Sequence, residues 1–276
     1  MASAVLDLVI IGSGPAAMTA AIYAARAELK VVVFEKAKIG GALTEIDQIS
    51  NFPGFSGSGN ELAENLKKQV TALGVEINYG TCEEIKLDDS GNKILLIDGE
   101  PVCARAVLVA TGSEPKTLDI DVAVPISYCA MCDAPLYKGK NIAVIGGGNS
   151  AIQEALYLAG VAKNVTIYTH GHFKADQILV DKITAFNNVE VRDALVESEL
   201  GSYDGVFVFI GKRPATKFLS AEILNADGYI ETKNYQTTLP GVFAAGDVRA
   251  DSIKQAVTAA ADGAAAALEI VDFLKK

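Results

Sequence analysis

Residues 7–17 read DLVIIGSGPAA, a short apolar run that ends in a glycine-rich turn, and residues 141–151 read NIAVIGGGNSA. The first glycine is Gly12 in one stretch and Gly146 in the other, an offset of 134 positions. A helical stretch and a second apolar run follow in both places, at residues 31–34 and at 165–168, with the same offset. The sequence therefore predicts one strand, turn, helix and strand unit that occurs twice, and an α/β fold.

The glycines of such a turn have physical roles. The first allows the chain to turn sharply, and the second lets backbone N–H groups approach a pyrophosphate that faces the helix N-terminus. Two copies in register predict two dinucleotide-binding, Rossmann-like domains. The alternative is two parallel-sheet units whose turns bind no nucleotide. The candidate contacts are Gly12, Gly14, Pro15 and Ala16 in the first copy, and Gly146, Gly148, Asn149 and Ser150 in the second.

The residue that ends the second strand differs between the copies. Glu35 ends it in the first copy, where a carboxylate accepts hydrogen bonds from ribose hydroxyls and repels a 2′-phosphate. The first site therefore suits FAD or NAD, although a solvated glutamate is the alternative. Thr169 stands at the same offset in the second copy, followed by His170 and Lys174 but by no carboxylate or arginine. The second site thus lacks a residue that selects either nicotinamide cofactor.

Cys129 and Cys132 form the close pair of cysteines, and Asp133 follows them. Two thiols at this spacing, at a turn or helix start, can close a small disulfide ring and exchange with other disulfides. Asp133 could relay a proton to or from a leaving thiolate, or it could cap a helix. The alternatives are two unreactive core thiols and half of a zinc site. Zinc needs further ligands, and the remaining candidates are scattered: Cys82, Cys103, His170 and His172.

Composition excludes several classes of protein. The 276 residues are 50% hydrophobic, which supplies a substantial core, and the net charge is −10, which argues against a nucleic-acid or anionic-membrane partner. No apolar run approaches the roughly 18–20 residues that a membrane span requires. The start lacks the basic first region of a signal peptide. We expect a soluble cytoplasmic protein.

Taken in order and spacing, these motifs resemble the low-molecular-weight thioredoxin reductases, which are FAD-dependent pyridine nucleotide-disulfide oxidoreductases. The resemblance covers essentially the whole chain and includes further loops and strand ends at residues 40–44, 51–55, 110–112, 244–247 and 255–258. It implies a discontinuous FAD domain, 1–112 with 242–276, and an inserted NAD(P)-like domain, 113–241, that carries the redox disulfide. The FAD contacts that it implies are Gly12, Gly14, Pro15, Ala16, Glu35, Gly41, Leu43, Thr44, Asn51, Thr111, Gly112, Gly246, Asp247, Gln255 and Ala256.

The resemblance also implies a mechanism. Reduced FAD passes two electrons to a Cys129–Cys132 disulfide, with Cys132 nearer the flavin. Cys129 then attacks the disulfide of a thioredoxin, and Asp133 supplies a proton. The inserted domain rotates between a flavin-facing and a thioredoxin-facing position, and the protein is a homodimer.

One stretch departs from the family pattern. NADPH-using members carry an arginine-rich stretch after the second strand of the inserted domain, whereas residues 169–174 here contain no arginine. Two lost arginine–phosphate contacts would weaken NADPH binding by orders of magnitude, at ~1.5–3 kcal/mol per charged hydrogen bond. His170, His172 and Lys174 are poor replacements, since neutral histidines bind phosphate weakly. We therefore expect another electron donor, ferredoxin or a deazaflavin, ahead of NADPH.

A protein donor would need a docking patch. The acidic net charge argues against ferredoxin, itself usually acidic, unless a local basic patch forms from Lys138, Lys140, Lys212 and Arg213. The other hypotheses are an ordinary NADPH-dependent thioredoxin reductase, a ferredoxin–NADP reductase-like flavoprotein, a flavin-bearing redox sensor and a nucleotide-binding scaffold without redox chemistry.

Overall fold

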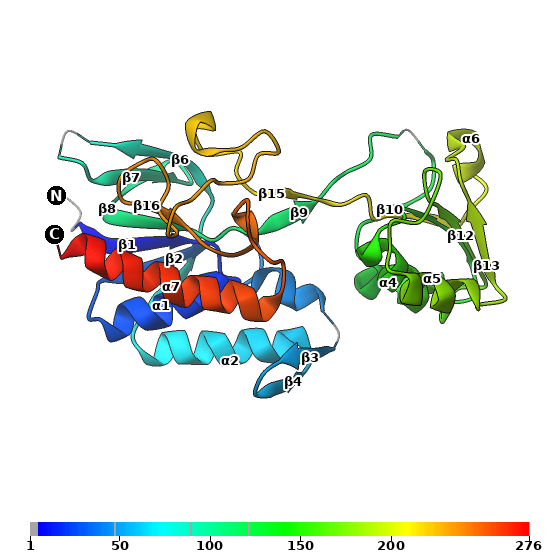
Figure 1. The fold of residues 1–276 in the computed structure, drawn as a ribbon, viewed down its shortest axis with the longest axis horizontal. Helices are drawn as coiled ribbons and strands as arrows, with labels where there is room; N and C mark the ends of the chain where they lie inside the picture. Colours follow the sequence, from blue (N-terminus) through cyan, green and yellow to red (C-terminus); the bar gives the residue numbers. More distant parts are fainter. Residues whose placement is uncertain (1–4, 47, 89, 121, 276) are drawn as a thin grey trace. The chain divides into compact units, whose positions relative to one another are not determined.

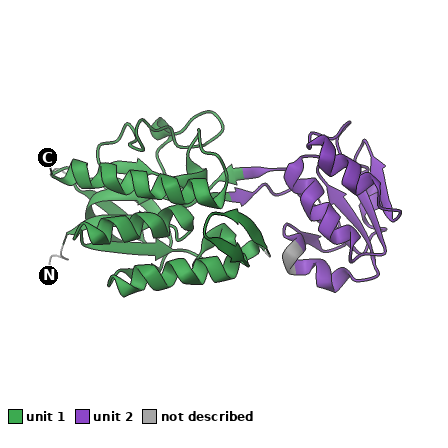
Figure 2. Cartoon of the chain, turned by 60° about the horizontal axis from the view of Figure 1, so that its bottom comes forward, with its two compact units in different colours: residues 1–113, 213–276 green, residues 114–212 purple. Residues whose placement is uncertain are grey.

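The computed structural model describes residues 5–46, 48–88, 90–120 and 122–275, and it leaves the side chains of residues 131 and 132 undescribed. The chain forms two compact units (Figure 2). Unit 1 comprises Met1–Ser113 and Arg213–Lys276, and unit 2 comprises Glu114–Lys212. No helix within the described ranges is long and apolar enough to cross a bilayer.

Unit 1 is built on one mixed sheet. Strands β5, β2, β1 and β8 run parallel, and β8 continues the sheet through the antiparallel strands β7 and β6. The last strand, β16, also pairs parallel with β8, beside its C-terminal half. The bounds are β1 Leu6–Ile11, β2 Val31–Glu35, β5 Glu76–Tyr79, β6 Cys82–Leu87, β7 Lys93–Ile97, β8 Glu100–Val109 and β16 Val242–Ala244.

Helices cover one face of this sheet (Figure 1). They are α1 Pro15–Arg26, α2 Gly59–Ala72 and α7 Ala256–Leu274. Along β1, Leu8 and Ile10 enter the core under these helices, while the alternate residues Val9 and Ile11 face a second core on the other side. This alternation is the period-2 pattern of a strand buried on both faces. Short elements complete the unit: η1 Gly41–Glu45, β3 Ile49–Phe52, β4 Phe55–Gly57, η3 Ala221–Ile223 and η4 Gly246–Val248.

Unit 2 contains a parallel sheet in the order β10, β14, β11, β12, β13. Ile142 and Val144 of β11 pack in the same core as the helix residues Ile152 and Ala155, and Ala143 faces the opposite core. The bounds are β10 Ile126–Ser127, α3 Ala130–Asp133, η2 Ala134–Tyr137, β11 Asn141–Ile145, α4 Asn149–Ala159, β12 Asn164–Tyr168, α5 Gln177–Thr184, β13 Val189–Arg192, α6 Glu197–Leu200 and β14 Gly205–Val208.

The chain passes from one unit to the other through two short strands that pair with each other, β9 Ser113–Pro115 and β15 Lys212–Pro214. The boundary after β15 differs from the expected one, because the sequence analysis placed residues 213–241 in the inserted domain. Ile223 and Ile230 of this segment are buried in the same core cluster as Val242. Ile230 N also donates to Val248 O (3.0 Å), so the segment packs on unit 1.

Candidate functional site

The first glycine turn joins the ends of three strands of unit 1. Gly12 has a positive φ of 104°, and its N–H donates to Phe34 O at 2.8 Å. A Cβ atom on Gly12 would lie 2.4 Å from Ala110 O, at the end of β8. Both the backbone conformation and the close approach therefore require glycine here, as the sequence predicted.

The space above this turn suits an anionic group. Gly14 is the N-cap of α1, and no described side chain caps that helix start. A Cβ on Gly14 would meet no described atom within 4 Å, and a Cβ on Gly41 would lie 3.4 Å from Gly14 Cα. With Pro15 first in the helix and no capping side chain, the first N–H groups of α1 lie at the positive end of the helix dipole. The described residues thus fit the pyrophosphate of a dinucleotide.

The Glu35 carboxylate is fixed by the turn itself. It is 7% exposed, and it accepts hydrogen bonds from Ser13 Oγ (2.6 Å) and Ala37 N (2.9 Å). Ser13 Oγ in turn accepts from Gly40 N at 3.0 Å. The sequence analysis missed Ser13, whose signal is a hydroxyl between the two glycines of the turn. This network holds the carboxylate at the end of β2, beside the nucleotide turn.

The structure brings two distant predicted contacts together. Asn51 Nδ2 donates to Gln255 Oε1 at 3.0 Å, which links β3 to the start of α7 at Ala256. In η1, Thr44 Oγ1 donates to Gly41 O at 2.9 Å, and the Leu43 side chain is 2% exposed. Leu43 therefore packs in the core, and only its main chain remains for a ligand.

A polar cluster supports the turn at Gly246 and Asp247. Asp262 Oδ2 accepts from Gly246 N (3.1 Å) and from the Arg249 guanidinium (2.8 Å). The Tyr235 hydroxyl donates to Asp262 Oδ1 at 3.3 Å, and Arg249 also stacks on the Tyr235 ring. Burial and the neighbouring Asp262 charge raise the pKa of Tyr235. None of these three supporting residues was singled out from the sequence.

The predicted contacts Thr111 and Gly112 lie where the chain leaves unit 1. Thr111 Oγ1 donates to Ala215 O at 2.8 Å, and Ala215 N donates to Gly112 O at 3.1 Å. Gly112 has a positive φ of 67°. These residues therefore hold the outgoing and returning segments together, in addition to any contact with a ligand.

The second glycine turn repeats the backbone of the first. Gly146 has a φ of 142°, and its Cβ would lie 2.3 Å from Phe209 O. Lys174 N donates to Gly147 O at 2.7 Å, which matches the bond from Gly40 N to Ser13 O at the same offset. Asn149 and Asp176 also pair, with Asn149 Nδ2 3.0 Å from Asp176 Oδ2.

The side chains around the second turn differ from those around the first. Thr169, at the position of Glu35, is 4% exposed, and its buried Oγ1 has no hydrogen-bond partner among the described residues. Ser150, His170, His172 and Lys174 are exposed. Unit 2 contains one arginine, Arg192 on β13. It is already engaged by Glu190 (2.8 Å) and Glu199, so it offers no free phosphate clamp.

The structure distinguishes the cysteines. Cys129 is disulfide-bonded, whereas Cys82 and Cys103 are free. The side chain of Cys132, the predicted partner, lies outside the described part of the chain. Burial raises the pKa of the Cys82 thiol to about 12, so this group stays protonated and unreactive near neutral pH.

A buried serine connects Cys129 to Asp133. Ser127, the last residue of β10, is 4% exposed, and its Oγ donates to Asp133 Oδ2 at 2.7 Å. The same Oγ accepts from Cys129 N at 3.2 Å, and Asp133 N donates to Cys129 O at 3.3 Å. The sequence analysis identified both ends of this network but not Ser127.

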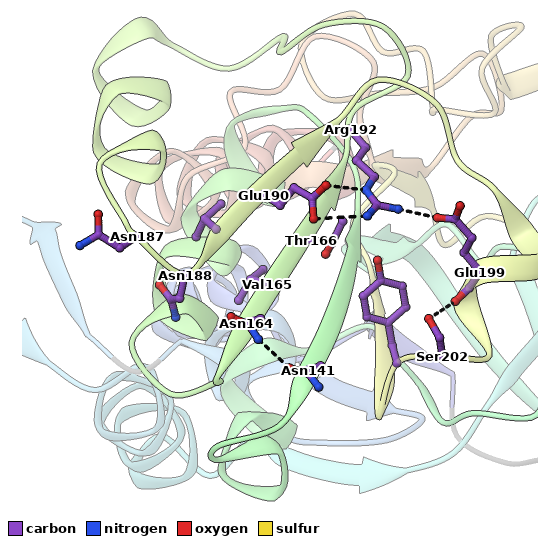
Figure 3. A pocket seen from close by; sticks show the side chains of 12 residues that line it. Asn141, Asn164, Val165, Thr166, Asn187, Asn188, Glu190, Arg192, Glu199 and Ser202 are labelled. Carbon is purple, nitrogen blue, oxygen red and sulfur yellow. Dashed lines mark hydrogen bonds and ion pairs between the residues drawn. The ribbon is translucent and has the colours of Figure 1, made fainter.

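Unit 2 also has a surface pocket of about 580 Å³ along β12 and β13 (Figure 3). Several of its polar groups pair with one another: Arg192 lies between Glu190 and Glu199, and Asn164 Nδ2 donates to Asn141 Oδ1 at 2.8 Å.

Comparison with known proteins places the chain in a family. The family model described as pyridine nucleotide-disulphide oxidoreductase matches residues 6–263. The chain belongs to this family. It is therefore a flavoprotein disulfide oxidoreductase that resembles the thioredoxin reductases, and the predicted class of enzyme and the α/β fold are confirmed.

Three similar proteins illustrate the match. The 34.2 kDa protein in rubredoxin operon of Clostridium pasteurianum is 39% identical, over 95% of this chain and 95% of the relative. The thioredoxin reductase of Bacillus subtilis (strain 168) is 34% identical, over 99% of this chain and 96% of the relative. The crystal structure of Lactococcus lactis thioredoxin reductase has a TM-score of 0.87 at 32% identity, and the match covers 98% of this chain and 99% of that one.

Proposed function

We propose that this enzyme is an FAD-dependent thioredoxin-disulfide reductase. The observation that carries the proposal is the bonded Cys129 sulfur beside Asp133, in a chain whose first glycine turn fits a dinucleotide. Full-length similarity to thioredoxin reductases supports the substrate class. Bound FAD supplies the two electrons that convert the enzyme disulfide into two thiols.

The residues that would hold FAD are those predicted from the sequence. The N–H groups at the start of α1 would bind the pyrophosphate, and Glu35, whose carboxylate Ser13 orients, would accept from ribose hydroxyls. Asn51 and Gln255 lie together at the start of α7, where their amides are available to a ligand.

The chain's own chemistry is thiol–disulfide exchange. The Cys129 thiolate attacks one sulfur of the substrate disulfide, whose S–S bond breaks, and the leaving sulfur takes a proton from Asp133. The second enzyme thiol, proposed to be that of Cys132, then gives its proton to the Asp133 carboxylate and attacks Cys129. The enzyme disulfide forms again, the released substrate sulfur takes this second proton from Asp133, and the substrate leaves as a dithiol with two added electrons and two added protons.

We propose that the electron donor is a protein of the ferredoxin type ahead of NADPH. The support is the second turn, where Thr169 replaces the selecting carboxylate and residues 169–174 contain no arginine. Arg192 also supports this proposal, because its ion pairs with Glu190 and Glu199 leave it unavailable to a 2′-phosphate. Four further points stay predictions: the homodimer, the domain rotation, the cytoplasmic location and a basic docking patch from Lys138, Lys140, Lys212 and Arg213.

Anaerobic reduction of the purified flavoprotein tests the donor and the activity together. Reduced ferredoxin, reduced rubredoxin, a reduced deazaflavin, NADPH and NADH are each mixed with the enzyme, and flavin absorbance near ~450 nm is followed. Thioredoxin is then added, and its new thiols are counted. We expect fast bleaching with a reduced protein donor and slow bleaching with either nicotinamide.

The same experiment separates the alternatives. Rapid turnover at low NADPH concentrations identifies an ordinary NADPH-dependent reductase. A Cys129→Ser variant that keeps full physiological activity identifies a ferredoxin–NADP reductase-like enzyme. Tight FAD without multiple turnovers on any thioredoxin identifies a redox sensor, and a colourless protein that refuses FAD contradicts every flavin-based function.

A further inference from the structure

The hydroxyl of Ser127 lies at the centre of a closed network around the redox-active turn. Its oxygen is 2.7 Å from Asp133 Oδ2, 3.2 Å from Cys129 N and 3.2 Å from Cys129 O. Asp133 N closes the network on Cys129 O at 3.3 Å. Strand β10, the first cysteine and the carboxylate are thus joined through one side chain.

The single hydroxyl proton has two possible acceptors, and the distances decide between them. A hydrogen bond from a hydroxyl to a carboxylate is the stronger kind, and 2.7 Å is typical of it, whereas the Cys129 carbonyl lies 0.5 Å farther away. Ser127 Oγ therefore accepts from Cys129 N–H and donates to Asp133. The Cys129 N–H and the Asp133 carboxylate therefore polarise each other through the Ser127 oxygen.

Ser127 lies in a rigid position, because the residue is 4% exposed at the end of strand β10. β10 pairs in parallel with β14, and Ser127 lies opposite Phe207, which is fully buried. A hydroxyl on such a rigid support can hold its partner in one orientation. Asp133 needs this support, because it is the last residue of the short helix α3.

We propose that Ser127 is a positioning residue that holds the Asp133 carboxylate beside Cys129 for proton transfer. Nothing in the sequence motif marks this residue. The proposal rests on the proposed role of Asp133 in thiol–disulfide exchange. It is independent of which protein donates electrons and of which thioredoxin accepts them.

Pre-steady-state exchange tests the proposal. The holoenzyme is reduced with dithiothreitol, desalted under argon and mixed at pH 7 with an alkyl disulfide, whose poor leaving thiolate needs a proton, and the new thiols are counted in quenched samples. We expect Ser127→Ala to slow exchange about tenfold and Asp133→Asn to slow it about a hundredfold, the latter at the lower end of the range for general acid–base catalysis.

A double-mutant cycle separates positioning from general damage. If Ser127 acts through Asp133, then Ser127→Ala has no further effect in the Asp133→Asn enzyme. Ser127→Thr, which keeps the hydroxyl, should recover most of the rate. Ser202→Ala is the matched control, since Ser202 is another serine of unit 2 that donates to a backbone carbonyl, Glu199 O at 2.6 Å, and it should change nothing.

Each outcome decides the proposal. Losses that multiply in the double variant, or a Ser127→Thr enzyme as slow as Ser127→Ala, overturn it. An Asp133→Asn enzyme with an unchanged exchange rate also overturns it. If that enzyme still reduces thioredoxin, the proposed function stands. Conversely, the effects of Ser127→Ala and Asp133→Asn on the exchange rate can be coupled although the enzyme reduces no thioredoxin. That result supports the role of Ser127 and contradicts the proposed substrate.

Discussion

The two glycine turns have almost the same backbone and different side chains. A Cβ on Gly12 would lie 2.4 Å from Ala110 O, and one on Gly146 would lie 2.3 Å from Phe209 O. Each turn also accepts one equivalent hydrogen bond from the loop after the second strand, from Gly40 N or from Lys174 N. The main-chain geometry is therefore retained in both copies.

The difference lies at the strand end beside each turn. In unit 1 the Ser13 hydroxyl donates to the buried Glu35 carboxylate at 2.6 Å. In unit 2 the equivalent positions are Gly147 and Thr169, and the buried Thr169 hydroxyl has no partner among the residues that the structure describes. Glycines thus specify the turn, whereas the Ser13–Glu35 pair of side chains distinguishes the first copy from the second.

Replacing the first glycine of each turn should have the largest effect. Gly12→Ala and Gly146→Ala each place a methyl group against a carbonyl oxygen at positive φ, with a cost on the order of 2–5 kcal/mol in unfolding free energy. Thermal unfolding and flavin absorbance per chain are the measurements. Gly12→Ala should lose both stability and FAD, and Gly146→Ala should lose stability while FAD still binds. Equal loss of FAD would contradict the assignment of the two turns.

The second glycines sharpen the comparison, because a Cβ on Gly14 or Gly148 meets no described atom within 4 Å. Gly14→Ala should leave the melting temperature of the FAD-free protein unchanged. It should weaken FAD binding by about 10- to 100-fold, roughly 1.4–2.7 kcal/mol, because the methyl group enters the pyrophosphate space. Gly148→Ala is the matched control in titrations that follow FAD fluorescence. An unaffected affinity in Gly14→Ala would mean that the flavin does not contact this turn.

Ser13→Ala should have a smaller effect. It removes one donor to the Glu35 carboxylate, which keeps Ala37 N, and one acceptor of Gly40 N, which keeps Ser13 O. The expected cost is therefore about 0.5–1.5 kcal/mol, the net contribution of one hydrogen bond. We expect a lower unfolding midpoint in urea and weaker FAD binding. Ser56→Ala, at an exposed serine of the same unit, serves as the control. A midpoint identical to that of the parent protein would show that the network adds nothing to stability.

Thr169→Val should have the smallest effect and the opposite sign. Valine has the same shape and removes a hydroxyl that is buried without a described partner, so the protein should gain up to about 1 kcal/mol. Urea unfolding measures this gain. If a ligand of the second turn uses this hydroxyl, the variant will instead bind that ligand more weakly, and titrations with NADPH, NADH and ADP will reveal which one.

Local patterns in the sequence predict much of the fold. The turns at Gly12 and Gly146 follow apolar runs that form β1 and β11, because a buried parallel strand reads as a continuous apolar segment. The need for glycine is local as well, since φ at both positions is positive. The close pair of cysteines likewise predicted a disulfide, and Cys129 is bonded.

Contacts between residues far apart in the chain could not be predicted from the sequence. Ser127 became important only because α3 returns the Asp133 carboxylate to the end of β10. Residues 213–241 carry no regular period, and their place in unit 1 follows from the burial of Ile223 and Ile230, which composition cannot reveal. The bond from Asn51 to Gln255 joins residues 204 positions apart, so no spacing rule predicts it.

The paired strands β9 and β15 have a consequence for how such a protein is assembled in evolution or in the laboratory. The chain departs after Ser113 and resumes at Arg213, and Ala215 N is 3.1 Å from Gly112 O, so the severed ends of unit 1 would already be neighbours if unit 2 were excised. A splice of a few flexible residues would close the gap without re-threading any strand. We therefore expect unit 1 to tolerate replacement of unit 2 by another domain.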